Sequence, residues 1–370
     1  MYIRLHNSCA YFVFETYFEI RSDIFDVVFK FKGVNSNFSN FLLGELEKGV
    51  EEHNVVEYLS LDYPLEKNKI KKIITFLISK KLLIKRIDRF SKEPHDTLYD
   101  RQIRFFDSFE NEQHNGESFN NRLQQRKVVI VGLGAYGSWL ALHCARMGIR
   151  QIIGIDFDTV ELSNLPRQVL YTINDIGISK AVACSKALTT VDPSIEFKGF
   201  IQKIENAHDL VPYLKDADLV FNAFGYYPKH EAQNLISGFI ADASIKTQTP
   251  MLCLSTNWLG PFYIPKSTAC YYCAVQQSEI EALVGKSRKN FRIEKRAFCP
   301  ILAMTCSLAA SEASIFLSGI NLPNSINSIL SLDPFNMEKN KRIPIQKLSC
   351  CDCHQIISDP LLLASNVYEN

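Results

Sequence analysis

The stretch VVIVGLGAYGSWLALHCARMGIRQIIGIDFDTVELSNLPRQ, residues 128–168, decides the fold of this chain. It opens with an apolar run typical of a buried strand and then turns through Gly132, Gly134 and Gly137. The first glycine permits a tight turn, the second lets the backbone approach a phosphate, and the third lets the next helix pack closely on the strand. The stretch therefore predicts a strand, a glycine turn and a helix whose first amides face an anion.

A second strand, QIIGIDFD, follows the helix and ends in acidic residues. Asp156 lies 19 residues after Gly137, a spacing suited to contact with ribose hydroxyls. A glycine motif alone is also typical of any Rossmann-like turn, so NAD and ATP fit this part of the sequence equally well.

The polar segment from Asp158 to Ala181 distinguishes the two nucleotides. It contains Asn164, Arg167, Gln168 and Lys180. Arg167 and Lys180 are candidate cations for a polyphosphate, because Arg offers a planar fork and Lys a mobile point charge. A hydride-transfer site gains little from such cations, whereas a site that expels pyrophosphate needs them. Each residue taken singly is more typical of a surface charge, and it is their combination behind the glycine turn that favours ATP.

The combined motifs GLGAYGS, IDFDTVELSNLPRQ and DIGISKA resemble the ThiF-type adenylating domain, which is shared with ubiquitin-activating enzymes and molybdopterin-synthase activators. YDRQIRFF (99–106) resembles the arginine-bearing helix that precedes that domain, and GPFYIPKSTACYYC (260–273) resembles part of its zinc site. The resemblance spans roughly residues 95–355. It implies that a carboxylate attacks the α-phosphate of ATP, giving an acyl-adenylate and pyrophosphate.

The resemblance also implies roles for individual residues. Arg101 would reach the ATP site of a second protomer, which implies a homodimer. The nucleotide-binding residues implied, for ATP with Mg²⁺, are Gly132, Gly134, Gly137, Asp156, Asp158, Asn164, Arg167, Gln168 and Lys180, of which Arg167 and Lys180 would join Arg101 in catalysis.

One segment departs from the family pattern. The family has an Asp after the next strand that helps to hold Mg²⁺, but LVFNAFGYYPKH (219–230) contains no carboxylate. Asn222 is the nearest polar residue and a weaker, neutral ligand. Either Mg²⁺ is held mainly by phosphate oxygens with Asp158 nearby, or the use of ATP is altered or lost.

The cysteines predict a metal site. The chain has 11 of them, an odd count that argues against a disulfide framework. Two short-spaced pairs supply the four thiolates of a structural zinc site, namely Cys270, Cys273, Cys350 and Cys353. Cys351 and His354 are further donors beside the second pair. Cys253, Cys299 and Cys306 are candidates for the nucleophile of sulfur- or ubiquitin-transferring relatives, but their apolar surroundings favour buried, inert thiols.

The chain divides into three predicted parts. Residues 1–90 combine aromatic, β-branched runs with amphipathic helices and predict a small winged-helix-like module. Residues 91–125 are polar and predict a linker that includes the arginine-bearing helix. Residues 126–370 predict a Rossmann-like, doubly wound α/β domain with a mostly parallel sheet and a zinc-clipped C-terminal segment. In the first part we expect strands over 10–20 and 26–34, a helix over 36–49, and a helix followed by a strand over 66–87.

A winged-helix-like module before a ThiF-type domain resembles maturases of ribosomally made peptides, of the microcin C and pantocin type. There the module resembles a leader-peptide recognition element, because an exposed strand edge can add an extended peptide as another strand. A structural or dimerisation role is the simpler alternative. The leading hypothesis is ATP-dependent adenylation of a precursor-peptide carboxylate. The alternatives are an activator of a sulfur-carrier or ubiquitin-like protein, and a peptide-binding homologue without catalysis.

The overall charge points to no polyanionic partner. The 370 residues include 41 basic and 40 acidic side chains, so we expect neither nucleic acid nor a membrane as a partner. No signal peptide is recognised. The apolar run 299–319 contains Glu312, which fits a buried helix better than a membrane span. A cytoplasmic location is expected.

Overall fold

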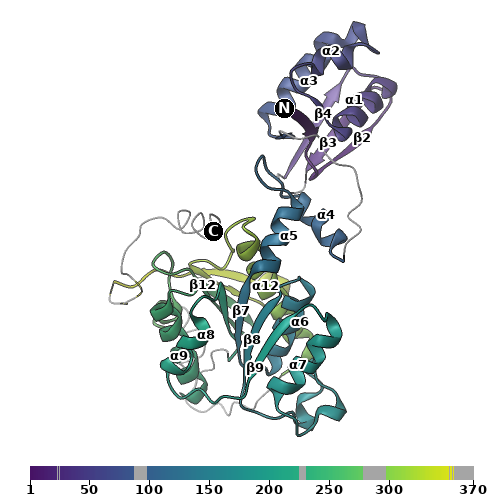
Figure 1. Cartoon of the computed structure of the whole chain (residues 1–370). Helices are drawn as coiled ribbons and strands as arrows, with labels where there is room; N and C mark the ends of the chain where they lie inside the picture. The colour runs from purple at the N-terminus through teal and green to yellow at the C-terminus, as the bar shows by residue number, and fades with distance from the viewer. Residues whose placement is uncertain are drawn as a thin grey trace. The chain divides into compact units, whose positions relative to one another are not determined.

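The computed structural model describes residues 1–22, 24, 26–86, 98–224, 231–277, 297–349, 351 and 353. The chain forms two compact units, Met1–Asn121 and Arg122–Asn370 (Figure 1). Residues 98–121 thus belong to the first unit. The three-part division at about residues 90 and 125 stays a prediction.

Among the described residues, the part of the first unit up to Arg86 contains two three-stranded antiparallel sheets and three helices. One sheet has the order β5-β1-β6, from Val50–Glu51, Tyr2–Leu5 and Leu83–Arg86, and the other has the order β2-β3-β4, from Cys9–Val13, Tyr17–Ser22 and Val27–Lys32. The helices are α1 (Ser36–Lys48), α2 (Val55–Ser60) and α3 (Lys67–Ser79). Helices packed on small antiparallel sheets confirm the expected class of module.

The run expected as one strand over 10–20 is a hairpin of two strands. Phe14 N donates to Tyr17 O at 2.9 Å, which closes a turn with Glu15 and Thr16 exposed at its tip. The run lacks Gly, Pro or Asn, so no turn residue in the sequence marks this reversal.

Local signals set the limits of α1. The Asn35 side chain accepts from Phe38 N at 2.8 Å at the start of the helix, and Gly49 ends it with φ +88°. Phe38 and Leu42 on its inner face are buried with Phe18 and Ile20 of β3 in the core of the unit. The same unit includes α4 (Asp100–Asp107) and the start of α5 (Gly116–Gln125).

The second unit is built on an eight-stranded sheet of order β14-β13-β12-β11-β10-β7-β8-β9. The five strands from β11 to β9 are parallel, whereas β12, β13 and β14 are added antiparallel. The chain reverses its direction of winding between β7 and β10, which is where open α/β sheets bind ligands. The strands are β7 (Lys127–Val131), β8 (Gln151–Ile155), β9 (Glu196–Phe200), β10 (Leu219–Asn222), β11 (Met251–Ser255), β12 (Trp258–Tyr263), β13 (Ser328–Ser331) and β14 (Lys341–Pro344).

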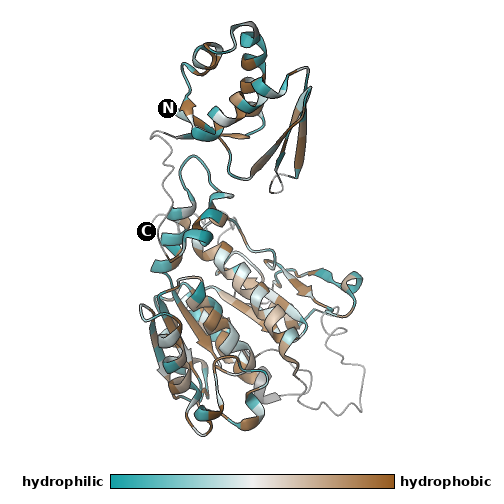
Figure 2. Ribbon diagram, turned by 90° about the vertical axis from the view of Figure 1, so that its right-hand side faces the viewer, coloured by the Kyte–Doolittle hydropathy of each residue, from teal (hydrophilic) through white to brown (hydrophobic). Residues whose placement is uncertain are grey.

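Helices cover both faces of this sheet (Figure 1). One face carries α6 (Ala135–Arg146), α7 (Lys180–Val191) and α12 (Cys299–Ser318), and the other carries α8 (Val211–Leu214), α9 (Glu231–Thr247) and α10 (Tyr271–Val275). Figure 2 shows hydrophobic strands between these helices. The doubly wound α/β prediction is confirmed.

The described residues also form short 3₁₀ turns. In the first unit this is η1 (Pro64–Glu66), and in the second unit these are η2 (Leu162–Asn164), η3 (Ile173–Asp175), η4 (Ala207–Asp209) and η5 (Met337–Lys339).

The helix α12 is long and apolar enough to cross a membrane by composition alone, and it is the one such helix among the described residues. It packs against α6, β11 and β12, and it buries Leu302, Cys306 and Phe316. Its Glu312 is also buried and accepts hydrogen bonds from Ser325 N and Oγ, both at 2.8 Å. In this fold α12 is therefore a core helix.

Candidate active site

The glycine turn joins β7 to α6 at the carboxyl edge of the parallel sheet. Gly132 has φ +90°, a conformation that other residues rarely adopt, and its amide donates to Ile155 O at 2.8 Å. A Cβ on Gly137 would lie 1.8 Å from Gly132 O. A Cβ on Gly134 would meet nothing nearer than Gln168 Nε2 at 3.8 Å, so open space lies beside the middle glycine. The three predicted glycine roles are consistent with this geometry.

Asp156 anchors the turn. Its carboxylate accepts from Leu133 N at 2.7 Å and from Asp158 N at 2.8 Å, and the residue is 8% exposed. Burial raises the pKa of the Asp156 carboxyl, and the nearby Lys180 charge and the two amides partly offset this. The sequence indicated only a ribose contact for this residue, which stays a prediction. Its anchoring of the turn was not anticipated.

Lys180 is held at the first turn of α7 by an ion pair. Its Nζ lies 2.8 Å from Asp158 Oδ2, and its side chain is 8% exposed, whereas that of Asp158 is 50% exposed. A lysine confined in this way has lost most of its conformational freedom before a ligand arrives. An incoming phosphate group would find this cation already in place.

The predicted polar segment lies around η2. Asn164 Oδ1 accepts from Glu161 N at 3.3 Å, and the Arg167 guanidinium donates to Ser163 O. Gln168 is 3% exposed, and its Oε1 has no hydrogen-bond partner among the described residues. A buried polar atom without a partner beside an open glycine turn marks a place where a polar ligand belongs.

These features fit a nucleotide. The turn leaves room for phosphate oxygens at Gly134, Lys180 supplies a positioned cation, and Gln168 supplies an unsatisfied polar group. The site lies at the reversal point between β7 and β10, as the fold requires. Bound ATP would provide an electrophilic α-phosphorus here, with pyrophosphate as the leaving group.

Asn222, the nearest polar residue to the missing family Asp, fits Mg²⁺ poorly. Asn222 is 1% exposed, and its Oδ1 accepts from Phe224 N and from Ser237 Oγ, both at 3.3 Å. Its Nδ2 faces Cys253 Sγ at 3.9 Å. The expectation that Asn222 serves as a weak ligand is therefore not supported, because its amide is used inside the protein.

Phe224 follows β10 at the carboxyl edge of the sheet, where the family pattern places a polar Mg²⁺ ligand. Its Cε2 lies 3.0 Å from the position that a Cβ on Gly132 would take, so the half-buried ring lies against the first glycine of the turn. The sequence showed only that a carboxylate was missing here. It did not reveal that an aromatic ring contacts the nucleotide turn.

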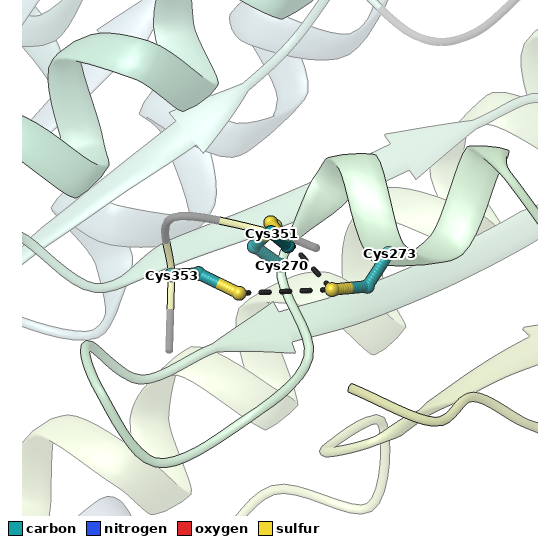
Figure 3. Close-up of side chains that lie close together, drawn as sticks. All are labelled: Cys270, Cys273, Cys351 and Cys353. Atoms are coloured by element: carbon teal, nitrogen blue, oxygen red, sulfur yellow. Dashed lines mark hydrogen bonds between the residues drawn. The ribbon is translucent and has the colours of Figure 1, made fainter. Parts of the chain in front are cut away.

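Four cysteines form a candidate metal centre in the second unit (Figure 3). The sulfur atoms of Cys270, Cys273, Cys351 and Cys353 all lie within 4.8 Å of one another. Individual separations are 3.8 Å for Cys270–Cys273, 3.4 Å for Cys270–Cys351 and 3.6 Å for Cys273–Cys353. Zn–S bonds of about 2.3 Å in a tetrahedron place sulfurs about 3.8 Å apart, so the cluster fits zinc.

Among the described residues, Cys351 and Cys353 supply the second pair of the cluster. Cys351 was expected as a further donor, whereas Cys350, expected as the ligand, and His354 lie outside the described residues. Cys270 and Cys353 hydrogen-bond to Cys273 and hold the pKa of its thiol far below the ordinary value, with help from Leu348 N at 3.4 Å. A thiolate stabilised before metal arrives suits a metal ligand.

The other candidate thiols show no sign of activation. Cys253 and Cys306 are buried in the core of the second unit. Burial raises the pKa of Cys253 to about 12 and also raises that of Cys306. Cys299, at the start of α12, is half-buried. The expectation of inert thiols at Cys253 and Cys306 agrees with this geometry.

Arg101 lies on α4 in the first unit, and its side chain is 94% exposed. Its nearest acidic group is Asp100, with Nε and Oδ2 4.0 Å apart. A catalytic role for this side chain stays a prediction.

The model of the ThiF family matches residues 99–354. The chain belongs to the ThiF family. Its N-terminal residues 1–98 lie outside that match.

Two ThiF-family relatives illustrate the sequence similarity. The sulfur carrier protein ThiS adenylyltransferase of Bacillus subtilis is 30% identical over 164 residues, which cover 43% of this chain and 46% of that protein. The chain thus spans about half the length of that relative. The sulfur carrier protein adenylyltransferase of Thermus thermophilus is 26% identical over 246 residues, which cover 62% of this chain and 85% of that protein.

Similarity in fold to solved structures covers more of this chain than sequence similarity to these two relatives does. Escherichia coli MccB, solved with AMPCPP and MccA, is 20% identical with a TM-score of 0.71, and the match covers 95% of this chain and 99% of that one. A second MccB structure, described as a microcin C7 biosynthetic enzyme in complex with N-formylated MccA, gives a TM-score of 0.72. Because the match covers 95% of this chain, the likeness in fold includes the first unit as well as the ThiF domain.

Proposed function

We propose that this ThiF-family protein is an ATP-dependent enzyme that adenylates a carboxylate of a ribosomally made precursor peptide, in the biosynthesis of a peptide antibiotic. The observation behind this proposal is the presence, in one chain, of a nucleotide site and of a first unit whose β2-β3-β4 sheet has an open edge at β4 among the described residues. The two sulfur-carrier adenylyltransferases described above match 43% and 62% of this chain, whereas the fold likeness to MccB covers 95% of it. Both MccB structures described above contain MccA.

The chemistry uses this chain's own residues in simple ways. A peptide carboxylate oxygen forms a bond to the α-phosphorus, and the bond from that phosphorus to the bridging oxygen of the β-phosphate breaks. Lys180 and Arg167 balance the charge that develops on the departing pyrophosphate. The amides at the start of α6 contact the phosphates, and Gln168 orients the nucleotide. The electron pair leaves with the pyrophosphate, so no redox partner is needed.

Asp158 has a further part in this scheme. Its ion pair with Lys180 holds the lysine in place before ATP binds. When phosphates arrive, Asp158 is the half-exposed carboxylate that a phosphate-bound Mg²⁺ would meet. Mg²⁺ would then be held mainly by phosphate oxygens.

A homodimer belongs to the same proposal. Arg101 is exposed and free to extend towards a second protomer, as its resemblance to the family arginine implies. The crossover region after β8 exposes large apolar side chains suited to burial against another copy, namely Phe157, Leu162, Ile173, Ile176 and Val182. We place the enzyme in the cytoplasm, where reduced cysteines can hold zinc.

The direct test is nucleotide turnover. Purified protein is incubated with Mg-ATP and the short peptide encoded beside its gene, and both the nucleotide products and the peptide mass are recorded. AMP and pyrophosphate with loss of water from the peptide indicate cyclisation through an adenylate. A peptide that gains the mass of a nucleotide indicates a microcin C-like product. The Lys180→Met variant is the control, and it should lose turnover while keeping peptide binding.

Two observations favour a second candidate. The Asn222 amide is turned inwards, and the Phe224 ring lies against Gly132. A homologue that binds a peptide without catalysis needs no Mg²⁺ ligand at this place and would tolerate both features. Peptide binding without AMP formation in the same assay would establish that alternative. A sulfur-carrier activator is supported if a small protein ending in Gly-Gly, and no short peptide, stimulates turnover.

A further inference from the structure

The helix that carries Arg101 depends on its neighbours for its position. α4 has eight residues, and a helix of this length is only marginally stable on its own, so contacts with other elements set its place. Ile103 and Phe106 on its inner side are buried, whereas the side chain of Arg101 is 94% exposed. The contacts of α4 therefore decide where Arg101 is presented.

α4 packs closely on the start of α5 (Figure 1). Gln102 Nε2 donates to Asn120 Oδ1 at 2.8 Å, and Gly116 N donates to Asp107 Oδ1 at 2.8 Å. A Cβ on Gly116 would lie 2.1 Å from Ile103 O, so a larger residue would push the two helices apart. We treat the two helices as one piece, the α4–α5 pair.

The connection between these two helices is attached to β1 and the residues that follow it. Arg4 Nη2 lies 2.7 Å from Glu110 Oε1, and Asn7 N donates to the same oxygen at 3.3 Å. His6 Nδ1 accepts from Ser8 N at 3.0 Å, so its Nε2 carries the proton and donates to Glu110 O at 3.0 Å. Both the side chain and the backbone of Glu110 are therefore bound at this place.

The strand β1 is a firm support for this attachment. It is the central strand of its sheet and pairs with both β5 and β6. Its Ile3 and Leu5 are buried in the core of the first unit, and His6 N donates to Leu82 O at 2.9 Å. Glu110 is thus tied to the core of the unit and not to a surface loop.

Burial distinguishes this ion pair. The side chain of Glu110 is 1% exposed and that of Arg4 is 16% exposed. In the pair Lys67–Glu57 of the same unit, the side chains are 56% and 65% exposed. A buried pair adds little net stability, because desolvation offsets the attraction, but separating its charges is strongly unfavourable. The pair therefore favours one position of the α4–α5 pair over all others.

We propose that Glu110 is a positioning residue for Arg101. Bound by Arg4 and His6, it fixes the α4–α5 pair on β1, so that Arg101 of one protomer is presented to the ATP site of the other. Glu110 acts through α4 and not by contact with the nucleotide. This inference rests on the proposed function, which assigns Arg101 to the second protomer's site.

The test uses a double variant chosen to keep the fold. Glu110→Gln alone would leave the Arg4 charge buried, whereas R4M/E110Q removes both charges, which is often close to neutral for stability. We expect its Tm to stay within about 4 °C of the parent chain. Turnover of ATP to AMP should nevertheless fall at least about tenfold, because a displacement of about 1 Å can cost a hundredfold in rate. Full turnover in R4M/E110Q overturns the proposal.

A matched control removes a carboxylate from an exposed pair of the same unit. Glu57→Gln breaks the ion pair with Lys67, whose side chain is 56% exposed. Its turnover and its Tm should stay close to those of the parent, with turnover within about twofold, because exposed ion pairs contribute little. A loss as large as that of R4M/E110Q would show that the effect is not particular to Glu110, and it overturns the proposal.

Mixing of variants shows in which protomer Glu110 acts. After subunit exchange with Lys180→Met, R4M/E110Q should recover about a quarter of the parent activity, because half of the dimers then combine an intact ATP site with a correctly held Arg101. After exchange with Arg101→Ala it should recover nothing above its own residual turnover, since both changes then affect the arginine. Damage to the variant's own ATP site would give the opposite pattern, which overturns the proposal.

A measurement without ATP separates this inference from the proposed function. Amide hydrogen exchange in α4 should become at least about tenfold faster in R4M/E110Q, while exchange in β7 stays as in the parent. Unchanged exchange in α4 overturns the inference even when the enzyme is active. If the parent chain forms no AMP, the proposed function fails, and faster exchange in α4 still supports its attachment through Glu110. An Arg101→Ala variant that turns over like the parent leaves adenylation standing and overturns this inference.

Discussion

Alanine at two neighbouring glycines should separate folding from nucleotide binding. In Gly137→Ala, the new Cβ would lie 1.8 Å from Gly132 O and 2.8 Å from Gly132 C. Both are backbone atoms of the turn, so α6 must move away from β7 by roughly an ångström. Overpacking of this kind costs about 3 kcal/mol, which lowers the Tm of a domain of this size by roughly 6–12 °C.

Gly134→Ala should behave in the opposite way. The nearest atom to its Cβ is Gln168 Nε2 at 3.8 Å, an ordinary contact. The free energy of unfolding should change by less than about 0.5 kcal/mol, as for substitutions that disturb no packing. The same Cβ fills the space through which phosphate oxygens reach the backbone, so the affinity for ATP should fall about tenfold or more.

Thermal melts without nucleotide and titrations with a fluorescent ATP analogue measure the two effects on the same samples. The reasoning is refuted if Gly137→Ala melts within about 2 °C of the parent chain, a shift worth about 0.5–1 kcal/mol. It is also refuted if Gly134→Ala binds the analogue as tightly as the parent, because the open space at Gly134 would then have no part in phosphate binding.

Three further outcomes are expected. Cys351→Ser should release the bound zinc measured by mass spectrometry, whereas Cys350→Ser should retain it, since Cys351 completes the four-sulfur cluster; retention in Cys351→Ser would show that another donor takes its place. Cys253→Ala should keep full peptide adenylation from pH 6 to pH 9, because burial raises the pKa of this thiol to about 12 and leaves it protonated throughout that range; a loss that grows with pH would instead indicate a thiolate nucleophile. Arg101→Ala and Lys180→Met should each abolish turnover when tested alone. An equal mixture of the two variants after subunit exchange should recover about a quarter of the parent activity, because half of the dimers would then have one intact site of two. No recovery would contradict an arginine shared between protomers.

The features that the sequence predicted well are those set by short-range geometry. The spacing of Gly132, Gly134 and Gly137 specifies a turn within a few residues, so its structure follows without knowledge of the rest of the chain. The α1 limits at Asn35 and Gly49 are equally local. The parallel sheet followed from the alternation of strands and helices, and the structure confirms it.

The features that the sequence did not predict depend on contacts between distant segments. Asn222 turns inwards because Ser237 of α9 and Cys253 of β11 lie beside it, which no local pattern reveals. Adjacent cysteines at 350 and 351 offer the same chemistry, and only the path of the chain brings Cys351 to Cys270. The hairpin at Glu15 has no turn residue to mark it.

The lysines of β4 have a consequence for solubility. An open strand with the sequence VVFKFK is a template for self-association, because its aromatic and β-branched residues favour further pairing. Lys32, together with Lys30, which pairs with Glu19 at 3.3 Å, brings like charges close when two such edges meet, so electrostatic repulsion disfavours pairing between two β4 edges. Replacing both lysines with neutral residues should therefore promote aggregation of the protein.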